Sequence, residues 1–323
     1  MTAPEPEWAA LLSRLPEPGP GRTTIGLAVD TGPHGADLLR AATVLADDFP
    51  ELGYLWLDDG ASAEGGAAAA RAMDARGVRL VVGHFNSASA LAAAPLYARA
   101  GAVLLAPGAT HPALTGTMPH CFRLCAHDLR QARLFAEELV VTGERPVLVT
   151  QRIAHGKSLG DAIEDLLRAA GCTPLRIDAD RPAEIPPLPP GPVAVIGRHA
   201  FAAALLPRLA SHPRVLLSDD CRTPHLLDAI RPGSSDLRVA ALGGAADPAP
   251  NGGAYALTSR AALEILAGAV EIAGPGPAAV AEVLRIRRWP TCLGTIEFDA
   301  MGEPLGIDWH WLRIAPAFAV EAN

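Results

Sequence analysis

Two apolar runs in the N-terminal part of the chain end in short polar side chains that could bind an anion. Ser87 stands shortly after the run VRLVVG, and Thr110 follows the run AVLLAPG. We expect a helix to begin near Ser87, and a helix N-terminus presents unpaired N–H groups and a positive dipole end. The small residues Gly108 and Ala109 would let a ligand approach the backbone. The two strand ends together predict a cradle for a carboxylate, although Ser87 taken alone is better explained as an N-cap.

A third apolar run, RVLLS, ends in Asp219 and Asp220. A carboxylate at that place would match an ammonium group, so the three strand ends together suit a ligand that carries both charges. Each of these residues alone is typical of a cap or a turn, and only the combination favours a ligand site.

Familiar catalytic and cofactor motifs are absent from the sequence. Gly156-Lys157-Ser158 follows a strand as the end of a phosphate-binding P-loop would, but Gln151 stands where that motif needs a glycine. The loop QRIAH is also too bulky to wrap a phosphate. No GxGxxG follows a strand, and no GxSxG, HExxH, EF-hand or CxxC pattern occurs, so we expect neither a cofactor nor a metal ion.

Apolar segments of strand length alternate with longer helical patterns along the chain, which is typical of βαβ units with a parallel sheet. In the first part of the chain we expect strands at Thr23–Asp30, Tyr54–Asp59, Val78–Gly83 and Ala102–Gly108. The alternation starts again with PVLVTQ, PLRIDA, PVAVIG and RVLLSDD. We therefore predict an α/β fold with two Rossmann-like lobes, each built on a mostly parallel, doubly wound sheet. Ligands of such sheets bind beyond the carboxyl ends of the strands.

The composition excludes several classes of protein. The 323 residues include 27 basic and 35 acidic side chains, a net charge of −8, and no run of Lys or Arg occurs, so we expect no binding to nucleic acid. Half of the residues are apolar, which is enough for a sizeable core, but only 5% are aromatic. No apolar stretch has the length that spans a bilayer, so we expect no membrane insertion.

The N-terminus and the cysteines bear on the compartment in which the protein works. The start MTAPEPEWAALLSRLPEPGPGR has neither the basic beginning nor the long apolar stretch of a secretory signal. The five cysteines are an odd and scattered set, which argues against a disulfide framework. We therefore expect a cytoplasmic protein, or a periplasmic or other extracytoplasmic one if a leader was removed.

The stretch VVGHFNSASALAAAPLYARAGAVLLAPGATHPALT resembles the leucine/isoleucine/valine-binding proteins, which are type I periplasmic binding proteins of branched-chain amino-acid ABC transporters. That family has a G-H-x-x-S segment, a helix, and a strand ending in P-x-A-T-x-P-x-L-T. The matching residues are Gly83, His84, Ser87, Pro107, Ala109, Thr110, Pro112, Leu114 and Thr115. The tail TCLGTIEFDAMGEPLGIDWHWLRI is similar to the family's closing segment, with a strand, a D-x-x-G turn and a return strand.

The resemblance covers about residues 23–314 and implies two lobes that are joined by three crossovers and close on a ligand. On this mapping residues 1–22 are a leader. Residues 23–125 with 244–292 form lobe one, and residues 126–243 with 293–323 form lobe two.

The resemblance also implies roles for single residues. Ser87 and Thr110 would hold the ligand carboxylate, the backbone of Gly108 would accept from the ligand ammonium, and Asp220 would pair with that ammonium. Aromatic residues of the family's pocket align with His155 and Tyr255.

The chain departs from the family at several places in the pocket. Arg198 stands where transporter members carry Tyr, and it would either pair with Asp220 or receive a second acidic group of the ligand. The first pocket loop is shortened around Gly32–Gly35 and has no clear aromatic counterpart. A Pro-rich loop at Pro182–Pro192 replaces a helix, and the segment before Tyr255 has also lost one.

These features predict a protein that binds an amino acid or a similar small molecule by lobe closure, without chemistry. It would serve as a cytoplasmic sensor or carrier, or as a transporter-derived binding protein, with a regulator or a permease as its partner. The alternative is a binding-protein fold recruited as a biosynthetic enzyme for an amino-acid-derived substrate. Its acid–base groups would be Asp219, Asp220, Arg198, His155 and Cys221. Ligand identity and oligomeric state stay open.

Overall fold

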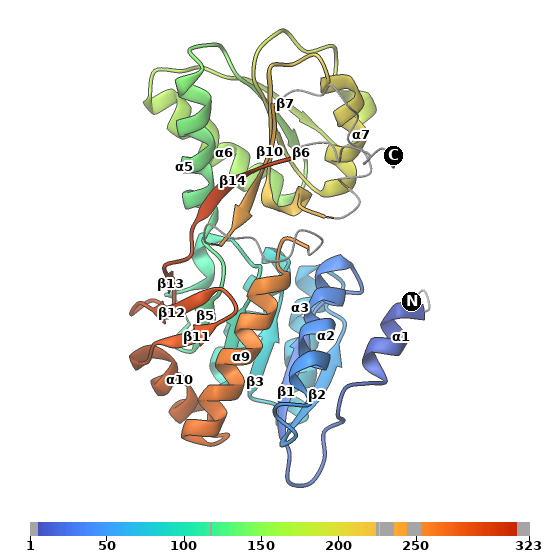
Figure 1. The fold of residues 1–323 in the computed structure, drawn as a ribbon, viewed down its shortest axis with the longest axis vertical. Coiled ribbons are helices and arrows are strands. Elements are labelled where there is room, and N and C mark those ends of the chain that lie inside the picture. The colour runs from blue at the N-terminus through green and yellow to red at the C-terminus, as the bar shows by residue number, and fades with distance from the viewer. Residues whose placement is uncertain (1–5, 117, 224–225, 227–235, 244–252, 315–323) are drawn as a thin grey trace, which may run out of the picture. The chain divides into compact units, whose positions relative to one another are not determined.

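The computed structural model describes residues 6–116, 118–223, 226, 236–243 and 253–314. The chain divides into two compact units. Unit 1 contains Met1–His127 and Gly243–Asp308, and unit 2 contains Asp128–Leu242 and Trp309–Asn323 (Figure 1). The chain therefore passes three times from one unit to the other, and the predicted fold of two α/β lobes joined by three crossovers is confirmed.

Unit 1 is built on a parallel sheet of five strands in the order β2-β1-β3-β4-β5. The strands are β1 (Thr23–Ala28), β2 (Leu52–Leu57), β3 (Leu80–Gly83), β4 (Val103–Ala106) and β5 (Cys121–Arg123). Every residue of β3 and β4 is buried. Central strands of a parallel sheet are covered on both faces, which explains why these segments are continuously apolar rather than alternating. The first four strands lie where the sequence predicts them.

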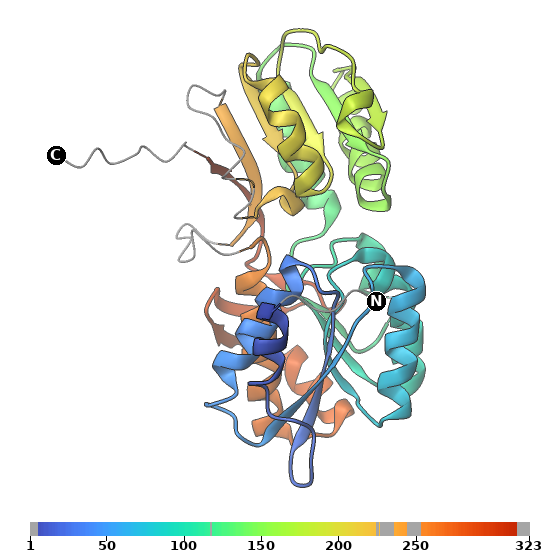
Figure 2. The ribbon, with the colours of Figure 1, turned by 90° about the vertical axis from the view of Figure 1, so that its right-hand side faces the viewer.

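Helices cover both faces of this sheet (Figure 2). They are α1 (Pro6–Leu12), α2 (Pro33–Leu45), α3 (Ala63–Ala75), α4 (Ser87–Ala100), α9 (Ala256–Ala273) and α10 (Pro277–Ile286). Helices α3 and α4 pack together on one face, while α2, α9 and α10 cover the other. Among the described residues no single helix is long and apolar enough to cross a membrane, and only the bent pair of α9 and α10 meets that criterion together.

The N-terminal segment belongs to unit 1 and is more than a leader. Helix α1 packs on α2, and Trp8, Leu11 and Leu15 are buried. Trp8 and Leu11 are three positions apart and so face the same side of α1, and Leu15 follows the end of that helix. The Trp8 indole N–H donates to the carbonyl of Thr31 at 2.7 Å, in the loop that follows β1.

The closing segment also differs from the sequence-based division, which assigned residues 293–308 to lobe two. In the structure these residues belong to unit 1. They form an antiparallel sheet of β11 (Trp289–Thr291), β12 (Gly294–Phe298) and β13 (Pro304–Leu305). The D-x-x-G turn between β12 and β13 packs on β5, because the N–H of Arg123 donates to the carbonyl of Gly302 at 2.9 Å.

Gly302 shows how closely this turn approaches β5. Its φ is +85°, and a Cβ placed there would lie 2.0 Å from the carbonyl oxygen of Cys121. We expect Gly302→Ala to lower the free energy of unfolding by about 2–3 kcal/mol, since overpacking adds to backbone strain. Gly306 is the matched control: its φ is +88°, but the nearest atom to a Cβ is 3.9 Å away.

Gly306→Ala should therefore cost only about 1 kcal/mol, from the backbone strain alone. Urea denaturation of both variants measures the difference. Equal losses would show that the close approach to Cys121 is not the cause.

Unit 2 is built on six strands in the order β14-β10-β9-β8-β6-β7. They are β6 (Val147–Gln151), β7 (Leu175–Ala179), β8 (Val193–Ile196), β9 (Arg214–Leu217), β10 (Asp236–Leu242) and β14 (Trp309–Arg313). Only β14 runs antiparallel, against β10. The four strands predicted here are β6 to β9. Strand β10 was missed, and β14 is the return strand of the closing segment.

Among the described residues, three helices cover this sheet: α5 (Asp128–Val141), α6 (Ala154–Ala169) and α7 (His199–Leu209). Figure 1 shows α5 and α6 on one face and α7 on the other. Between β7 and β8 the chain forms only a short 3-10 turn, Pro182–Glu184, as expected of a Pro-rich loop. Arg208 of α7 holds the segment by donating to the carbonyls of Pro182 and Ile185 at 2.9 and 2.7 Å. The other predicted helix loss, before Tyr255, falls mostly on residues outside the described ones.

Candidate ligand-binding site

The loop from β3 to α4 places Ser87 beside the loop that follows β4. The helix N-cap is Asn86 and not Ser87: the Asn86 side chain accepts from the N–H groups of Ala88 and Ser89 at 2.9 and 3.3 Å. Asn is among the best N-caps, because its short amide reaches these N–H groups. The Ser87 hydroxyl is therefore available elsewhere, and it accepts from the N–H of His111 at 3.3 Å. The two predicted strand ends are thus joined by a hydrogen bond.

Thr110 and Gly108 carry backbone and side-chain groups without partners. Thr110 is only 3% exposed, yet within the described residues neither its N–H nor its hydroxyl makes a hydrogen bond. The carbonyl of Gly108 likewise accepts no hydrogen bond in this part of the chain. Buried polar groups are normally paired. The N–H and hydroxyl of Thr110 could therefore donate to a carboxylate, and the carbonyl of Gly108 could accept from an ammonium group.

Three ring side chains surround the backbone of Gly108. A Cβ on Gly108 would lie 2.6 Å from the Phe85 ring and 3.0 Å from the Tyr255 ring. His34 completes the group: its ring centroid is 5.8 Å from that of Phe85 and 5.0 Å from that of Tyr255. Tyr255 therefore lies beside the Gly108 loop. The sequence did not point to His34 or Phe85 as members of this group, and His34 lies in the shortened first loop.

A buried network lies at the base of the β3 loop. His84 has a positive φ of 45°, and its side chain is fully buried. Its Nδ1 is 2.8 Å from Asp59 Oδ2, and its Nε2 is 3.1 Å from the Tyr97 hydroxyl. Burial, together with the charge of Asp59, raises the pKa of Tyr97, so this phenol stays protonated and can donate to Nε2. The network fixes the point at which the chain turns towards Ser87.

In unit 2 the predicted residues lie in an acidic cluster around His155. His155 Nε2 is 3.5 Å from Asp219 Oδ1, and Nδ1 is 3.8 Å from Asp128 Oδ1. Burial opposes the charged imidazolium, but Asp219, Asp128 and Asp220 outweigh it and raise the pKa of His155 to about 10. His155 is therefore a cation at neutral pH. Asp219 is buried, whereas Asp220 is half-buried and is the more accessible of the two neighbouring carboxylates.

Arg198 does not occupy the buried position expected of it. It is exposed and stands at the N-cap position of α7, where its backbone N–H donates to Gln151 Oε1 at 2.9 Å. Its guanidinium forms no ion pair with Asp220 or with any other described residue. The turn from β8 into α7 directs this side chain to solvent, so the expected internal pair is not formed.

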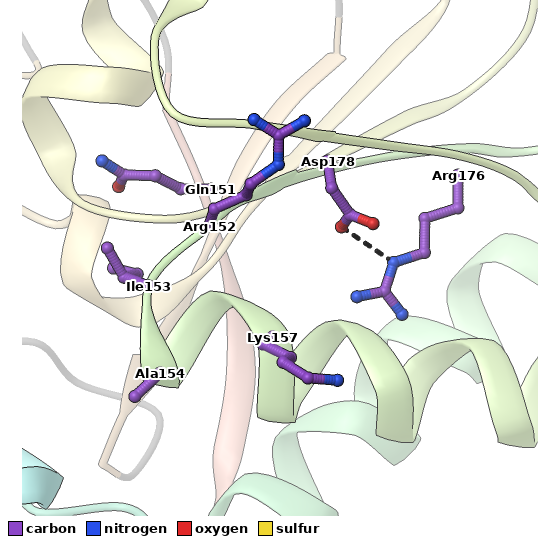
Figure 3. Close-up of a pocket in the computed structure, with 7 residues that line it drawn as sticks. All are labelled: Gln151, Arg152, Ile153, Ala154, Lys157, Arg176 and Asp178. Atoms are coloured by element: carbon purple, nitrogen blue, oxygen red, sulfur yellow. Dashed lines mark hydrogen bonds and ion pairs between the residues drawn. The ribbon is translucent and has the colours of Figure 1, made fainter.

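A cavity of about 410 Å³ lies next to Gln151, between the start of α6 and the edge strand β7 (Figure 3). It is lined by Gln151, Arg152, Ile153, Ala154, Lys157, Arg176 and Asp178. Its cations are already paired: Arg176 with Asp178 at 3.0 Å, and Lys157 with Asp161 at 2.9 Å. Among the described residues no group of three or more His, Cys, Asp or Glu could hold a metal ion.

Comparison with known proteins places these observations in a family. A model of the family described as periplasmic binding protein matches residues 27–182. The Leu/Ile/Val-binding protein BraC3 of Rhizobium johnstonii is 30% identical over 50% of this chain and 48% of its own length. The Leu/Ile/Val-binding protein homolog 1 of Brucella abortus is 25% identical over 87% of this chain and 86% of its own. The chain thus spans about half of the first relative and most of the second.

Two solved structures show the same fold. A leucine-binding protein LivK from Thermotoga maritima has a TM-score of 0.76 and 18% identity, and the match covers 90% of this chain and 99% of that one. An ABC transporter substrate-binding protein from Desulfitobacterium hafniense, in complex with Leu, has a TM-score of 0.71 and 23% identity over 90% and 100% of the chains. The chain therefore has the fold of the type I periplasmic binding proteins, and its sequence is similar to the branched-chain amino-acid-binding proteins of that group.

Proposed function

We propose that the protein binds an amino acid or an amino-acid-like small molecule, with the carboxylate at Ser87 and Thr110. The observation that carries this proposal is the buried Thr110, whose N–H and hydroxyl have no partner among the described residues. The unpaired carbonyl of Gly108 would accept from the ligand ammonium. Hydrogen bonds to charged groups are the strong ones, so these few contacts can supply much of the affinity.

The second unit contributes the opposite charge in this proposal. Asp220, at the carboxyl end of β9, would pair with the ligand ammonium, and closure of the units on the ligand would shift an existing equilibrium. Arg198 would receive an acidic group of the ligand. That role is supported by its exposed guanidinium, which has no ion-pair partner among the described residues. A preference for aspartate or glutamate over leucine in calorimetry would support it.

No observation favours the enzyme alternative. His155, the residue that could best act as a base, is held as a cation by Asp128 and Asp219.

A cytoplasmic place of action is a separate proposal, supported by the five cysteines, which are all free thiols. Fractionation of cells that express the natural gene from its own start tests it. Recovery from the extracytoplasmic fraction would contradict it.

We expect Ser87→Ala and Thr110→Ala each to weaken amino-acid binding by about tenfold or more, because each removes a hydrogen bond to a charged group. Calorimetry with a panel of amino acids measures the effect. The control is Ser13→Ala, which removes an exposed hydroxyl of the same unit and should leave the affinity unchanged. Unchanged affinity in the Ser87→Ala/Thr110→Ala double variant would overturn the carboxylate assignment.

A further inference from the structure

The largest fully buried side chain among the described residues lies directly behind Thr110. Arg123, at the end of β5, is 0% exposed. Its guanidinium donates to the carbonyl of Ala109 at 2.6 Å and to the carbonyl of His111 at 2.9 Å. These two carbonyls stand immediately before and after Thr110. A single planar group therefore fixes the backbone on both sides of the residue that carries the unpaired donors.

The contact between Arg123 and the carbonyl of Ala109 also sets the orientation of the Thr110 N–H, because the peptide group is planar. The carbonyl of Ala109 and the N–H of Thr110 belong to the same planar trans peptide, so they point in opposite directions. Because the carbonyl points at Arg123, the N–H points away from it. A positive charge on the carbonyl side also polarises the peptide, which strengthens its N–H as a donor.

The contact to His111 extends the effect to the other strand end. The N–H of His111 donates to the Ser87 hydroxyl at 3.3 Å, while its carbonyl is held by Arg123. The guanidinium therefore fixes the segment that links Ser87 to Thr110.

Glu303 supplies the negative charge that offsets the cost of burying the Arg123 guanidinium. It lies at the end of the D-x-x-G turn, and its Oε1 accepts from Arg123 Nε at 3.1 Å and from the Thr115 hydroxyl. The Asp299 side chain accepts from the N–H of Glu303 at 2.9 Å and so orients that residue. A buried cation without a partner would be strongly unfavourable. The closing hairpin thus supplies the counter-charge for a residue about 180 positions earlier in the chain.

We propose that Arg123 and Glu303 are positioning residues for the ligand carboxylate: they hold residues 109–111 so that the Thr110 donors face the ligand. The proposal rests on the proposed carboxylate site at Ser87 and Thr110. It requires that the pair affects binding through the Thr110 backbone and not only through the stability of unit 1.

Replacing both Arg123 and Glu303 distinguishes an effect on protein stability from an effect on the position of the Thr110 backbone. Arg123→Met alone leaves Glu303 without its partner and is expected to destabilise the protein. The double variant Arg123→Met/Glu303→Leu removes both charges, and such replacements of a buried pair often restore stability. We expect the double variant to melt within about 5 °C of the wild type. Its affinity for the amino acid that binds the wild type should nevertheless stay about tenfold weaker or more.

A second measurement needs no ligand. The amide resonance of Thr110 reports the hydrogen bonding and polarisation of its own peptide group, and we expect it to move in the double variant. Arg123→Lys keeps the charge but cannot bond both carbonyls as a planar fork does, so it should move the resonance less and recover part of the affinity. The matched control is Arg285→Met, since Arg285 packs on Phe122 of β5 without touching the Thr110 loop.

The outcomes distinguish the two proposals. If the double variant is stable and binds as the wild type does, or if its Thr110 amide resonance does not move, the pair has no positioning role. If no amino acid binds the wild type but the Thr110 resonance moves, the proposed ligand is wrong, while the effect of Arg123 on the Thr110 peptide stands.

Discussion

His155→Gln is expected to lower the free energy of unfolding by about 3–5 kcal/mol at neutral pH, since removing one partner of a buried ion pair is strongly destabilising. The side chains of Asp128 and Asp219 are 3% and 2% exposed, and each lies within 4 Å of the imidazole, at 3.8 and 3.5 Å. Glutamine at position 155 would remove the imidazolium charge that lies beside both carboxylates.

The same variant should remove a pH dependence of stability. The pKa of His155 is raised to about 10 in the folded protein, above the ordinary value of 6.5. The folded state therefore binds the proton more tightly than the unfolded chain. Its stabilising effect is complete below about pH 6.5 and is lost as the pH rises towards 10. Between pH 6.5 and 8.5 we expect the wild type to lose about 2 kcal/mol from this group.

Burial also shifts the pKa of other groups, and it raises that of Asp30 and Asp37. Burial also raises the pKa of Cys121 and Cys292 to about 12 and about 11, so these thiols matter only where the unfolded chain ionises, above about pH 8.5.

Urea denaturation at several pH values between 6.5 and 8.5 measures the effect. Lys157→Gln is a suitable control, because it breaks an exposed ion pair with Asp161 on the same helix. It should change stability by less than about 1 kcal/mol and leave the pH dependence intact. A pH dependence in His155→Gln as steep as that of the wild type would show that His155 does not carry it.

Trp8→Ala is expected to cost about 3–5 kcal/mol, the usual loss when a buried aromatic side chain is removed. Trp8 is 3% exposed, and its ring centroid lies 5.4 Å from that of Trp56. Its ring also contacts the start of α2, since a Cβ at Gly35 would come within 2.8 Å of it. The side chain therefore joins α1 to the first loop of unit 1.

Trp8→Phe is the graded control for this prediction. It keeps most of the buried ring but loses the hydrogen bond to the carbonyl of Thr31, so we expect a loss of only about 1–2 kcal/mol. Thermal and urea unfolding measure both variants. If Trp8→Ala unfolds as the wild type does, the N-terminal helix is not part of the folded unit.

The predicted strands agree with the structure where burial is complete on both faces. Leu80–Gly83 and Val103–Ala106 are apolar without interruption. Such a pattern is typical of a parallel strand that is covered on both faces. Strand β5 was missed because three residues carry too little pattern. The packing of α1 was missed for a related reason: Trp8, Leu11 and Leu15 give one short apolar face inside a Pro-rich start.

The sequence pointed to the strand ends that carry Ser87 and Thr110. It did not point to the side chains that support them. Asn86 and Ser87 are adjacent polar residues, and from the sequence either could cap the helix. In the structure the N-cap is Asn86 and not Ser87. Arg123 and Glu303 stand about 180 positions apart, and no local spacing links them. The rings of His34, Phe85 and Tyr255 meet for the same reason, since three separate segments of the chain bring them to Gly108.

The five free thiols have a practical consequence for measuring motion. Cys121, Cys125 and Cys221 are buried, whereas Cys172 and Cys292 are half-buried. Cys172 belongs to unit 2 and Cys292 to unit 1. The native chain therefore carries one accessible attachment point for a spin label or fluorophore in each unit. A change in the distance between two such labels when an amino acid is added would be a direct spectroscopic record of closure.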